Sequence, residues 1–543
     1  MIKKILPAVA GLLFICNLSS LAMEKDDPIM VSGIRPMGMG GAFTAVADDE
    51  NSVFYNPAGI TQRTGDLIQI FNVNAAVSGD AIAAVNDLSK VASNINAGGD
   101  DNSKVDDLVK INDSIADKDI NFSLSVFNPA YISAPMSVGN NGNSISFGAG
   151  IFNSASIGVK AGMHIPQFML DFMQIATNGD LTDQNALINS VPDSMLNASN
   201  ILKPGVTAAD VRNAIAAGED WTWISNNLLS TQTGNLIDQI QSIADDSSLA
   251  DGDKYTQIVN ALSNFASSNP NWANWSIDGA HASATIKSYA TATLDVPFAY
   301  KFDSLDALHL PGKLSLGVNL KYIQRVKFAQ TVIIDNSQVA QLLNGAGIDD
   351  VINTKAGVSY GQGYGLDFGM MYSLTPRWNF GLQVSDVFTN IDYNQGYSLN
   401  KDYYPDSDFT HMAYIAPQLN IGASYIPKSI LGWDTKNRLM FAADIRDITG
   451  NYTDSFKNQT HIGAEYKYGC LALRLGLNQL RPSAGIGVEF NVFQLSYAFY
   501  GAESELAKAL GNPDQTVYYH QLQIAFKIGN NKGRTVEENK KVS

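Results

Sequence analysis

The sequence predicts an all-β protein: a transmembrane antiparallel β-barrel of about fourteen strands, with a helical extracellular insert. Three observations predict this fold class. Large apolar side chains alternate with small or polar ones over many segments. The links between these segments mostly alternate between long and short along the chain. After residue 22, no run of eighteen uncharged apolar residues occurs, so helical membrane spans are excluded.

The amino terminus predicts export. Two lysines precede an apolar core at residues 5–15, and small residues follow at Ser20 and Ala22. This pattern predicts a signal peptide over residues 1–22, cleaved after Ala22. A lipoprotein modified at Cys16 is a less favoured alternative, because an isoleucine stands where a small residue normally precedes the lipidated cysteine. An uncleaved anchor is disfavoured too, because the apolar core is too short to cross about 30 Å of hydrocarbon.

Composition excludes several functions. The net charge of −16 argues against nucleic acid as a partner, because phosphate binding needs a basic surface. The only cysteines are Cys16 and Cys470, which cannot build a disulfide framework or a zinc site. The histidines are scattered, and neither a nucleophile elbow nor a phosphate-binding loop occurs. We therefore expect no catalytic residues, no metal and no cofactor.

Alternation with a period of two predicts the strands. Over residues 471–478, for example, leucines occupy one face, and the other face carries alanine, arginine, glycine and asparagine. A strand separates these two sets of side chains, whereas a helix would mix them around its surface. Most segments reach the about nine to eleven residues that a tilted membrane strand needs. The predicted strands are 66–77, 119–127, 144–160, 281–302, 313–334, 361–374, 377–391, 412–426, 437–447, 458–468, 470–478, 482–490, 492–500 and 516–529.

The links sort into two classes. The shorter turns include residues 128–143, 303–312, 375–376, 427–436, 469 and 491. The other class comprises residues 78–118, 161–280, 335–360, 392–411, 448–457, 479–481 and 501–515, and only 479–481 is short. Long extracellular loops and short periplasmic turns are typical of outer-membrane barrels, whereas a soluble exported β protein has no reason to sort its links. We therefore expect a barrel over 65–529 and a polar periplasmic tail over 530–543.

The two longest links, 78–118 and 161–280, have helical periodicity. Thr207 and Asp210 have the spacing of a capping box, which predicts a helix start in the second link. This insert contains four tryptophans. They either fill a small core of the insert, which we favour, or line an exposed apolar groove as ligand contacts. These residues are Trp221, Trp223, Trp272 and Trp275.

Residues 33–60 contain a glycine-rich start, an acidic turn and an Asn-Pro-Ala-Gly sequence just before the first predicted strand. The acidic turn lacks the spacing of a calcium-binding EF-hand, so a solvated turn or a helix cap is the favoured interpretation. The stretch resembles the FadL-like (OmpP1/FadL/TodX) superfamily of outer-membrane transport proteins. The matching residues are Gly38, Gly40, Gly41, Asp48, Asp49, Asn56, Pro57, Ala58 and Gly59.

In that family the segment folds as a hatch that plugs the lumen, which implies a hatch over residues 23–64 here. Members of the fatty-acid branch bind hydrophobic substrates outside and pass them through the barrel wall at a kinked strand, opened by hatch movement. The resemblance therefore implies a channel in the outer membrane of a Gram-negative bacterium, surrounded by outer-membrane lipid. Its ligand would be a hydrophobic small molecule such as a long-chain fatty acid.

A different function stays open. Residues 458–529 are also similar to the related PorV and TraF-like branches of the superfamily. That similarity implies a non-transporting barrel that acts as a scaffold in protein secretion or plasmid conjugation. In this alternative, residues 161–280 would form the surface that binds a protein partner.

Overall fold

The computed structural model describes most of the predicted barrel, the hatch and part of the insert. The described residues are 23–29, 33–63, 66–82, 119–127, 131–138, 143–164, 184–191, 193–197, 201–249, 251–268, 281–334, 356–399, 401, 404–430, 432–435, 438–453, 455–490, 492–503 and 516–529. The predicted signal peptide, the C-terminal tail, most of link 78–118, Trp272 and Trp275 lie outside these residues.

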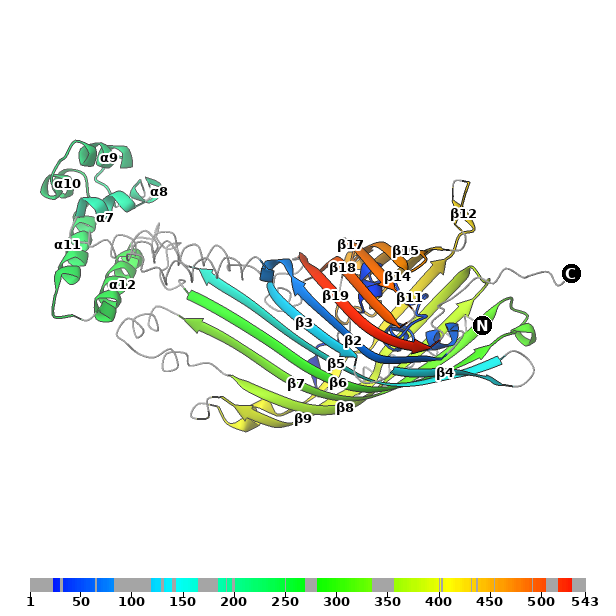
Figure 1. The fold of residues 1–543 in the computed structure, drawn as a ribbon. Coiled ribbons are helices and arrows are strands. Elements are labelled where there is room, and N and C mark those ends of the chain that lie inside the picture. The colour runs from blue at the N-terminus through cyan, green and yellow to red at the C-terminus, as the bar shows by residue number, and fades with distance from the viewer. Residues whose placement is uncertain are drawn as a thin grey trace.

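Sixteen strands build the barrel wall, and each pairs antiparallel with its neighbours (Figure 1). They are β2 (Leu67–Ser78), β3 (Asp119–Phe127), β4 (Tyr131–Val138), β5 (Asn143–His164), β6 (His281–Phe302), β7 (Lys313–Ile334), β8 (Gly357–Ser373), β9 (Trp378–Ser398), β10 (His411–Ile415), β11 (Gln418–Tyr425), β14 (Leu439–Ile445), β15 (Thr460–Tyr468), β16 (Leu471–Asn478), β17 (Arg481–Glu489), β18 (Phe493–Glu503) and β19 (Thr516–Gly529).

The wall closes through two sets of pairs. β19 pairs with β2, and β9 pairs with both β10 and β11. β3 and β4 share one position between β2 and β5, and β10 and β11 share another beside β9. The described strands therefore occupy fourteen positions around a closed ring, which confirms the predicted fold class. A separate two-stranded sheet joins β12 (Ser429–Ile430) to β13 (Trp433–Asp434).

Several predicted boundaries are wrong. β9 continues to Ser398, seven residues past the predicted end of its strand at 391. The segment predicted as a turn over 128–143 contains β4, and the predicted strand 412–426 is interrupted between Ile415 and Gln418. The prediction treated the whole segment from 128 to 143 as one turn. In the structure β4 is part of the wall, because it pairs with β2 over Tyr131–Ser133 and with β5 over Ile132–Val138.

The wall is much taller on one side than on the other. β5, β6 and β7 each have 22 residues, whereas β14 has seven and β16 has eight. A tilted membrane strand needs only about nine to eleven residues. The surplus of the tall wall lies at the end where the long links begin, because the short turns sit together at the other end (Figure 1).

The outer surface of the wall is apolar. On β7, Leu316 and Leu320 face outward with 44% and 53% of their surface exposed, whereas Asn319 between them is fully buried. The same alternation recurs on strands around the ring. A surface of exposed leucine, isoleucine and phenylalanine over buried polar residues fits a lipid environment and not water. The chain is therefore a multi-pass barrel of the outer-membrane type. No helix in the described part of the chain is long and apolar enough to cross a membrane.

Two helical parts complete the fold. The hatch contains α2 (Ile34–Gly38), α3 (Ser52–Tyr55) and the 3₁₀ helix η1 (Pro57–Gln62). The insert contains α7 (Gln184–Ser190), α8 (Asp193–Leu196), α9 (Ala208–Ala216), α10 (Trp221–Asn227), α11 (Thr231–Asp245) and α12 (Asp251–Ser268). The predicted capping box of Thr207 and Asp210 opens α9. Short elements at the strand ends are η5 (Asp306–Leu308), η6 (Asp406–Phe409) and α15 (Phe456–Gln459).

Candidate functional site in the barrel lumen

The hatch segment, residues 33–63, is enclosed by the barrel. All of its residues are buried except Phe54 and Gln62, which are partly exposed. Its two ends contact opposite sides of the ring: η1 packs on β6, β7 and β8, and α2 packs on β16, β17 and β18. The segment therefore bridges the lumen from wall to wall. The assignment of residues 23–64 as a gating unit stays a prediction.

Gly40 and Gly41 make the tight turn after α2. Their φ angles of +65° and +78° lie in the left-handed region that glycine tolerates best. A Cβ at Gly40 would lie 2.4 Å from the carbonyl oxygen of Ile462, so the turn also needs the missing side chain. His461 Nδ1 lies 2.9 Å from the Gly40 carbonyl oxygen, which fixes the turn against β15.

Glycines on the inner face of the wall let the hatch backbone approach closely. A Cβ at each would lie within 3 Å of a hatch atom. For example, a Cβ at Gly463 would lie 2.1 Å from the carbonyl oxygen of Met39, and one at Gly381 would lie 2.3 Å from that of Thr44. The sequence placed glycines on this face, but only the structure shows that the hatch rests on them. The set comprises Gly317, Gly369, Gly381, Gly463, Gly476 and Gly485.

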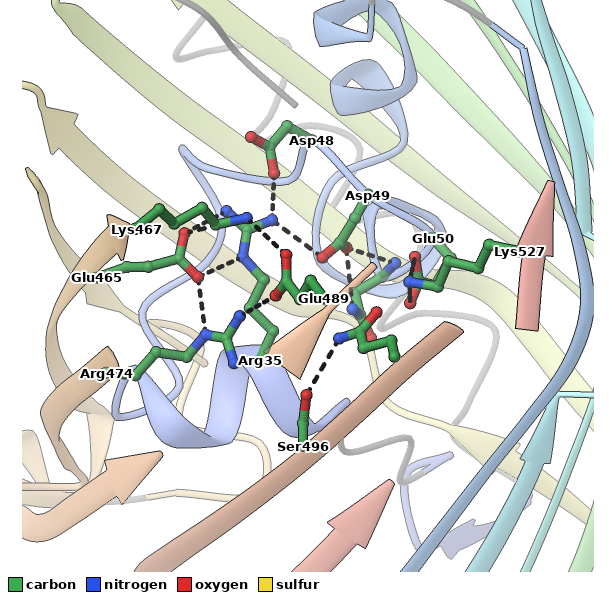
Figure 2. Close-up of polar contacts among 12 residues, drawn as sticks. Arg35, Asp48, Asp49, Glu50, Glu465, Lys467, Arg474, Glu489, Ser496 and Lys527 are labelled. Atoms are coloured by element: carbon green, nitrogen blue, oxygen red, sulfur yellow. Dashed lines mark hydrogen bonds and ion pairs between the residues drawn. The ribbon is translucent and has the colours of Figure 1, made fainter. Parts of the chain in front are cut away.

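Arg35 is the centre of a buried ion network (Figure 2). Its guanidinium donates from Nη2 and Nε to the carboxylate of Glu465 on β15, at 2.8 and 2.9 Å. It also pairs with Asp48 and, at 3.0 Å, with Asp49. Burial alone would lower the pKa of Arg35, but the surrounding carboxylates outweigh it and raise the pKa well above the usual range. The guanidinium therefore stays charged.

The network continues into the wall. Arg474 on β16 donates to Glu465 at 2.7 Å and pairs with Glu489 on β17, and Lys467 lies 3.2 Å from Glu489. A second ion pair joins Lys527 on β19 to Glu50 of the hatch at 2.8 Å (Figure 2). Buried charges are tolerated only when they are paired, so this network fixes where the hatch sits.

Asp48 and Asp49 do not form a solvated turn. Both are buried, and their carboxylates face Arg35. Asp49 also accepts hydrogen bonds from the backbone and side chain of Asn51 at 2.9 Å. The solvated-turn interpretation failed because sequence alone could not show that a distant barrel encloses this stretch. The described residues contain no group of three or more histidine, cysteine or acidic side chains suited to a metal ion.

The Asn-Pro-Ala-Gly sequence joins the hatch to the wall. The side-chain amide of Asn56 donates to the carbonyl oxygens of Thr44 and Met370, at 2.9 and 3.0 Å. Its side-chain oxygen accepts from the Ala58 N–H at 3.1 Å, which caps η1 at Pro57. A Cβ at Gly59 would lie 2.0 Å from the Ala47 carbonyl oxygen. Asn56 thus holds three backbone segments together.

Asp444 on β14 was not singled out from the sequence. Its carboxylate accepts the backbone N–H groups of Phe43 and Thr44, both at 2.7 Å. Neither its residue type nor its position in a strand distinguishes it from other inward-facing polar residues. Only the path of the hatch reveals its role.

The first described residues form a second lumenal contact. β1 (Glu24–Asp26) pairs in parallel with β10. The carboxylate of Asp26 accepts from Arg325 on β7 at 3.1 Å and from the hydroxyl of Tyr393 on β9. Ile29 packs on an apolar patch of the inner surface. The patch comprises Ile323, Ile391, Tyr393, Ala413 and Ile415, all buried.

The wall is irregular beside this patch. β9 pairs with β11 through Ser385 and with β10 from Thr389 onward. Asp386 and Phe388, between these pairings, have φ angles of 59° and 55°, which are strained for residues with a Cβ. The register with β8 shifts at the same level, on either side of Leu366. The hydrogen-bonded ladder is therefore broken on both edges of β9 at one height.

The insert has its own core of mainly aliphatic residues, contributed by α7 to α12. Trp221 packs at the edge of this core and donates from its indole nitrogen to Asp238 at 2.8 Å. Trp223, on the same helix, is 42% exposed. The role of these tryptophans as ligand contacts stays a prediction, and Trp272 and Trp275 lie outside the described residues.

No protein-family model matches the chain. No curated protein matches it either. Several solved structures are similar over nearly the whole length. A deletion mutant of the TodX monoaromatic hydrocarbon channel matches 93% of this chain and 100% of its own, with 10% identity and a TM-score of 0.39. The toluene transporter TodX of Pseudomonas putida matches 94% and 100%, with 11% identity and a TM-score of 0.35.

A FadL homologue of Pseudomonas aeruginosa matches 92% of this chain and 98% of its own, with 9% identity and a TM-score of 0.31. These identities and scores are low. The assignment of the chain to the outer-membrane type of barrel therefore rests on its own strand pairing and on its exposed apolar surface.

Proposed function

We propose that the chain is an outer-membrane channel for a hydrophobic compound such as a long-chain fatty acid, gated by its N-terminal hatch. The observation that carries the proposal is the buried apolar patch around Ile391 and Ile323, covered by the segment that contains Ile29. An apolar surface inside the lumen suits a hydrophobic ligand, because burying the ligand's apolar surface supplies the binding free energy.

The broken ladder of β9 supports a route through the wall. Strained residues such as Asp386 and Phe388 persist where the surrounding structure holds them, and such sites are often functional. Missing ladder bonds lower the cost of separating neighbouring strands there. In the proposed mechanism, the ligand displaces the segment over the apolar patch and leaves beside β9 into the membrane, while the hatch closes the periplasmic half of the lumen.

Uptake measurements test the proposal. Proteoliposomes that contain the full chain are given oleate or toluene, and uptake is compared with that of Ile391→Gln, which makes the patch polar at similar volume. The control is Ile421→Gln on β11, whose side chain is 39% exposed on the outer face. We expect Ile391→Gln to slow uptake several-fold and Ile421→Gln to leave it unchanged. Equal uptake by both variants would show that the patch has no role in uptake.

A second candidate function is a scaffold in secretion or conjugation, with the insert as the surface that binds a protein. The self-contained core of α7 to α12 favours it, because a long loop needs no core of its own to serve permeation. A form that lacks residues 23–55 separates the two functions, once its heat-modifiable folding is verified. A channel should conduct more without its hatch. A barrel that stays closed, with no uptake in either form, supports the scaffold.

A further inference from the structure

Polar side chains interrupt the apolar outward face of the tall wall, and apolar ones such as Ile157 on β5 follow above them. Going up β7, Leu316 and Leu320 are followed on the same face by Tyr322 and then Gln324. Going up β5, Ile151 is followed by Asn153. The strand register aligns these changes into rows across the wall, because each row consists of residues paired side by side.

One such row lies directly below this interruption. It runs through Ile151, Leu294, Tyr322 and Tyr364, which pair in that order on β5, β6, β7 and β8. Tyr364 is 71% exposed, and its ring lies 5.2 Å from that of Tyr322. Exposed tyrosines at the border of an apolar band are typical of the membrane interface.

The next row carries carboxamides. Asn153 pairs with Ala292, Ala292 with Gln324, and Gln324 with Gln362. Two residues of a strand span about 7 Å, so this row lies just beyond the tyrosines, on the side of the long links. The side chain of Gln324 donates to the Tyr322 hydroxyl at 3.2 Å, and that hydroxyl donates to Gln362 at 3.2 Å.

A groove of about 560 Å³ runs along this row. Its floor is low because Ala155, Ala290 and Ala292 are small, whereas Tyr360 and Gln362 rise at one end. The lining offers amide donors and acceptors beside an exposed tyrosine ring. The single cation among the described lining residues is Arg325, whose guanidinium is buried on the lumenal side against Asp26.

We propose that this amide groove binds the neutral sugar headgroup of a glycolipid in the outer leaflet. Carboxamides can donate to and accept from neighbouring sugar hydroxyls, and an aromatic ring packs against the apolar face of a sugar. A phosphate headgroup would need a basic pocket, and the outward lining has none among the described residues. The groove borders the apolar surface directly, so the acyl chains of the same lipid lie along Leu294 and Leu320.

The test measures lipid binding to the full chain by native mass spectrometry. The probes are a diglycosyl diacylglycerol and, in comparison, phosphatidylglycerol. One variant combines Gln324→Ala with Gln362→Ala, and a second, Ala292→Trp, fills the groove but keeps the amides. The matched control is Ala484→Trp on β17, an outward position between Leu475 and Phe499 on the low wall.

We expect the wild type and Ala484→Trp to retain the glycolipid in preference to phosphatidylglycerol. Both groove variants should bind the glycolipid about tenfold more weakly, the factor that corresponds to about 1.4 kcal/mol. Their binding of phosphatidylglycerol should not change. Equal glycolipid binding by all four proteins, or a preference of the wild type for phosphatidylglycerol, would overturn the proposal.

Discussion

Arg35 of the hatch and Glu465 of the barrel wall form a two-bond ion pair although 430 positions separate them in the sequence. Both side chains are almost completely buried, at 8% and 3% exposure. The pair therefore depends on the complete fold: the hatch must enter the lumen and β15 must be in place before either charge is compensated. This dependence makes it the most sensitive point at which to test the hatch.

Replacing Arg35 with methionine should loosen the hatch. The change leaves Glu465, Asp48 and Asp49 buried with less compensating charge, and breaking a buried pair on one side costs about 3–5 kcal/mol. We expect an assembled barrel with higher conductance in planar bilayers and easier proteolysis of the hatch. The control is Lys401→Met, because Lys401 and Asp406 form an exposed pair at 3.7 Å. That variant should change stability by less than about 1 kcal/mol, and equal effects of both changes would contradict the assigned role of Arg35.

Adding one methyl group at Gly463 should displace the hatch. The new Cβ would lie 2.1 Å from the Met39 carbonyl oxygen, so the backbone must move. Such overpacking costs about 1–3 kcal/mol. Gly79→Ala is the comparison, because a Cβ there would meet only Tyr518 O at 3.7 Å. Thermal unfolding of the two variants in detergent measures the difference, and a Gly463→Ala barrel as stable as Gly79→Ala would show that the hatch does not rest on this strand.

Acid should weaken the hatch through Asp49. Burial alone would raise the pKa of Asp49, but the charges of Arg35 and Lys527 outweigh it and hold the pKa below the usual value. A carboxyl whose pKa is lower in the folded state stabilises the fold fully above its unfolded value of about 4. That stabilisation is lost as the pH falls further, through the folded pKa.

Conductance recorded from neutral to acidic pH checks this expectation. We expect the wild type to open below about pH 4, and Asp49→Asn to conduct more already at neutral pH with a smaller acid response. Asp246→Asn is the control, because the pKa of Asp246 is lowered by a hydrogen bond from Ser248 within the exposed insert. If Asp246→Asn altered the acid response as Asp49→Asn does, the response would not report on the hatch.

The border of the apolar surface can be tested on a single strand. Leu320 and Gln324 face outward on β7, one below and one above the row of tyrosines. An arginine facing lipid near the midplane costs about 2–4 kcal/mol, and one near the interface about 0–1. Leu320→Arg should therefore reduce the heat-modifiable, folded fraction in the outer membrane far more than Gln324→Arg. Similar losses from both variants would place the membrane border at another level.

Much of the barrel could be predicted because strand alternation is local. A pleated strand sends neighbouring side chains to opposite faces whatever its partners are, so the sequence alone placed Leu473 outside and Ala472 inside. The two classes of link, long and short, can also be recognised without knowing which strands pair. The sequence did not predict β4, because this short strand is defined by its pairing with β2 and β5.

An antiparallel barrel with an apolar outer face can be predicted from the amino-acid sequence, because these properties follow from side-chain spacing along each strand. The contacts of the inner face form only in the complete fold. Gly463 meets Met39, Arg35 meets Glu465, and the strain at Asp386 and Phe388 arises where β9 changes partners. These contacts join residues hundreds of positions apart or depend on a register shared by several strands. No local pattern encodes them, because each exists only when the wall has closed around the hatch.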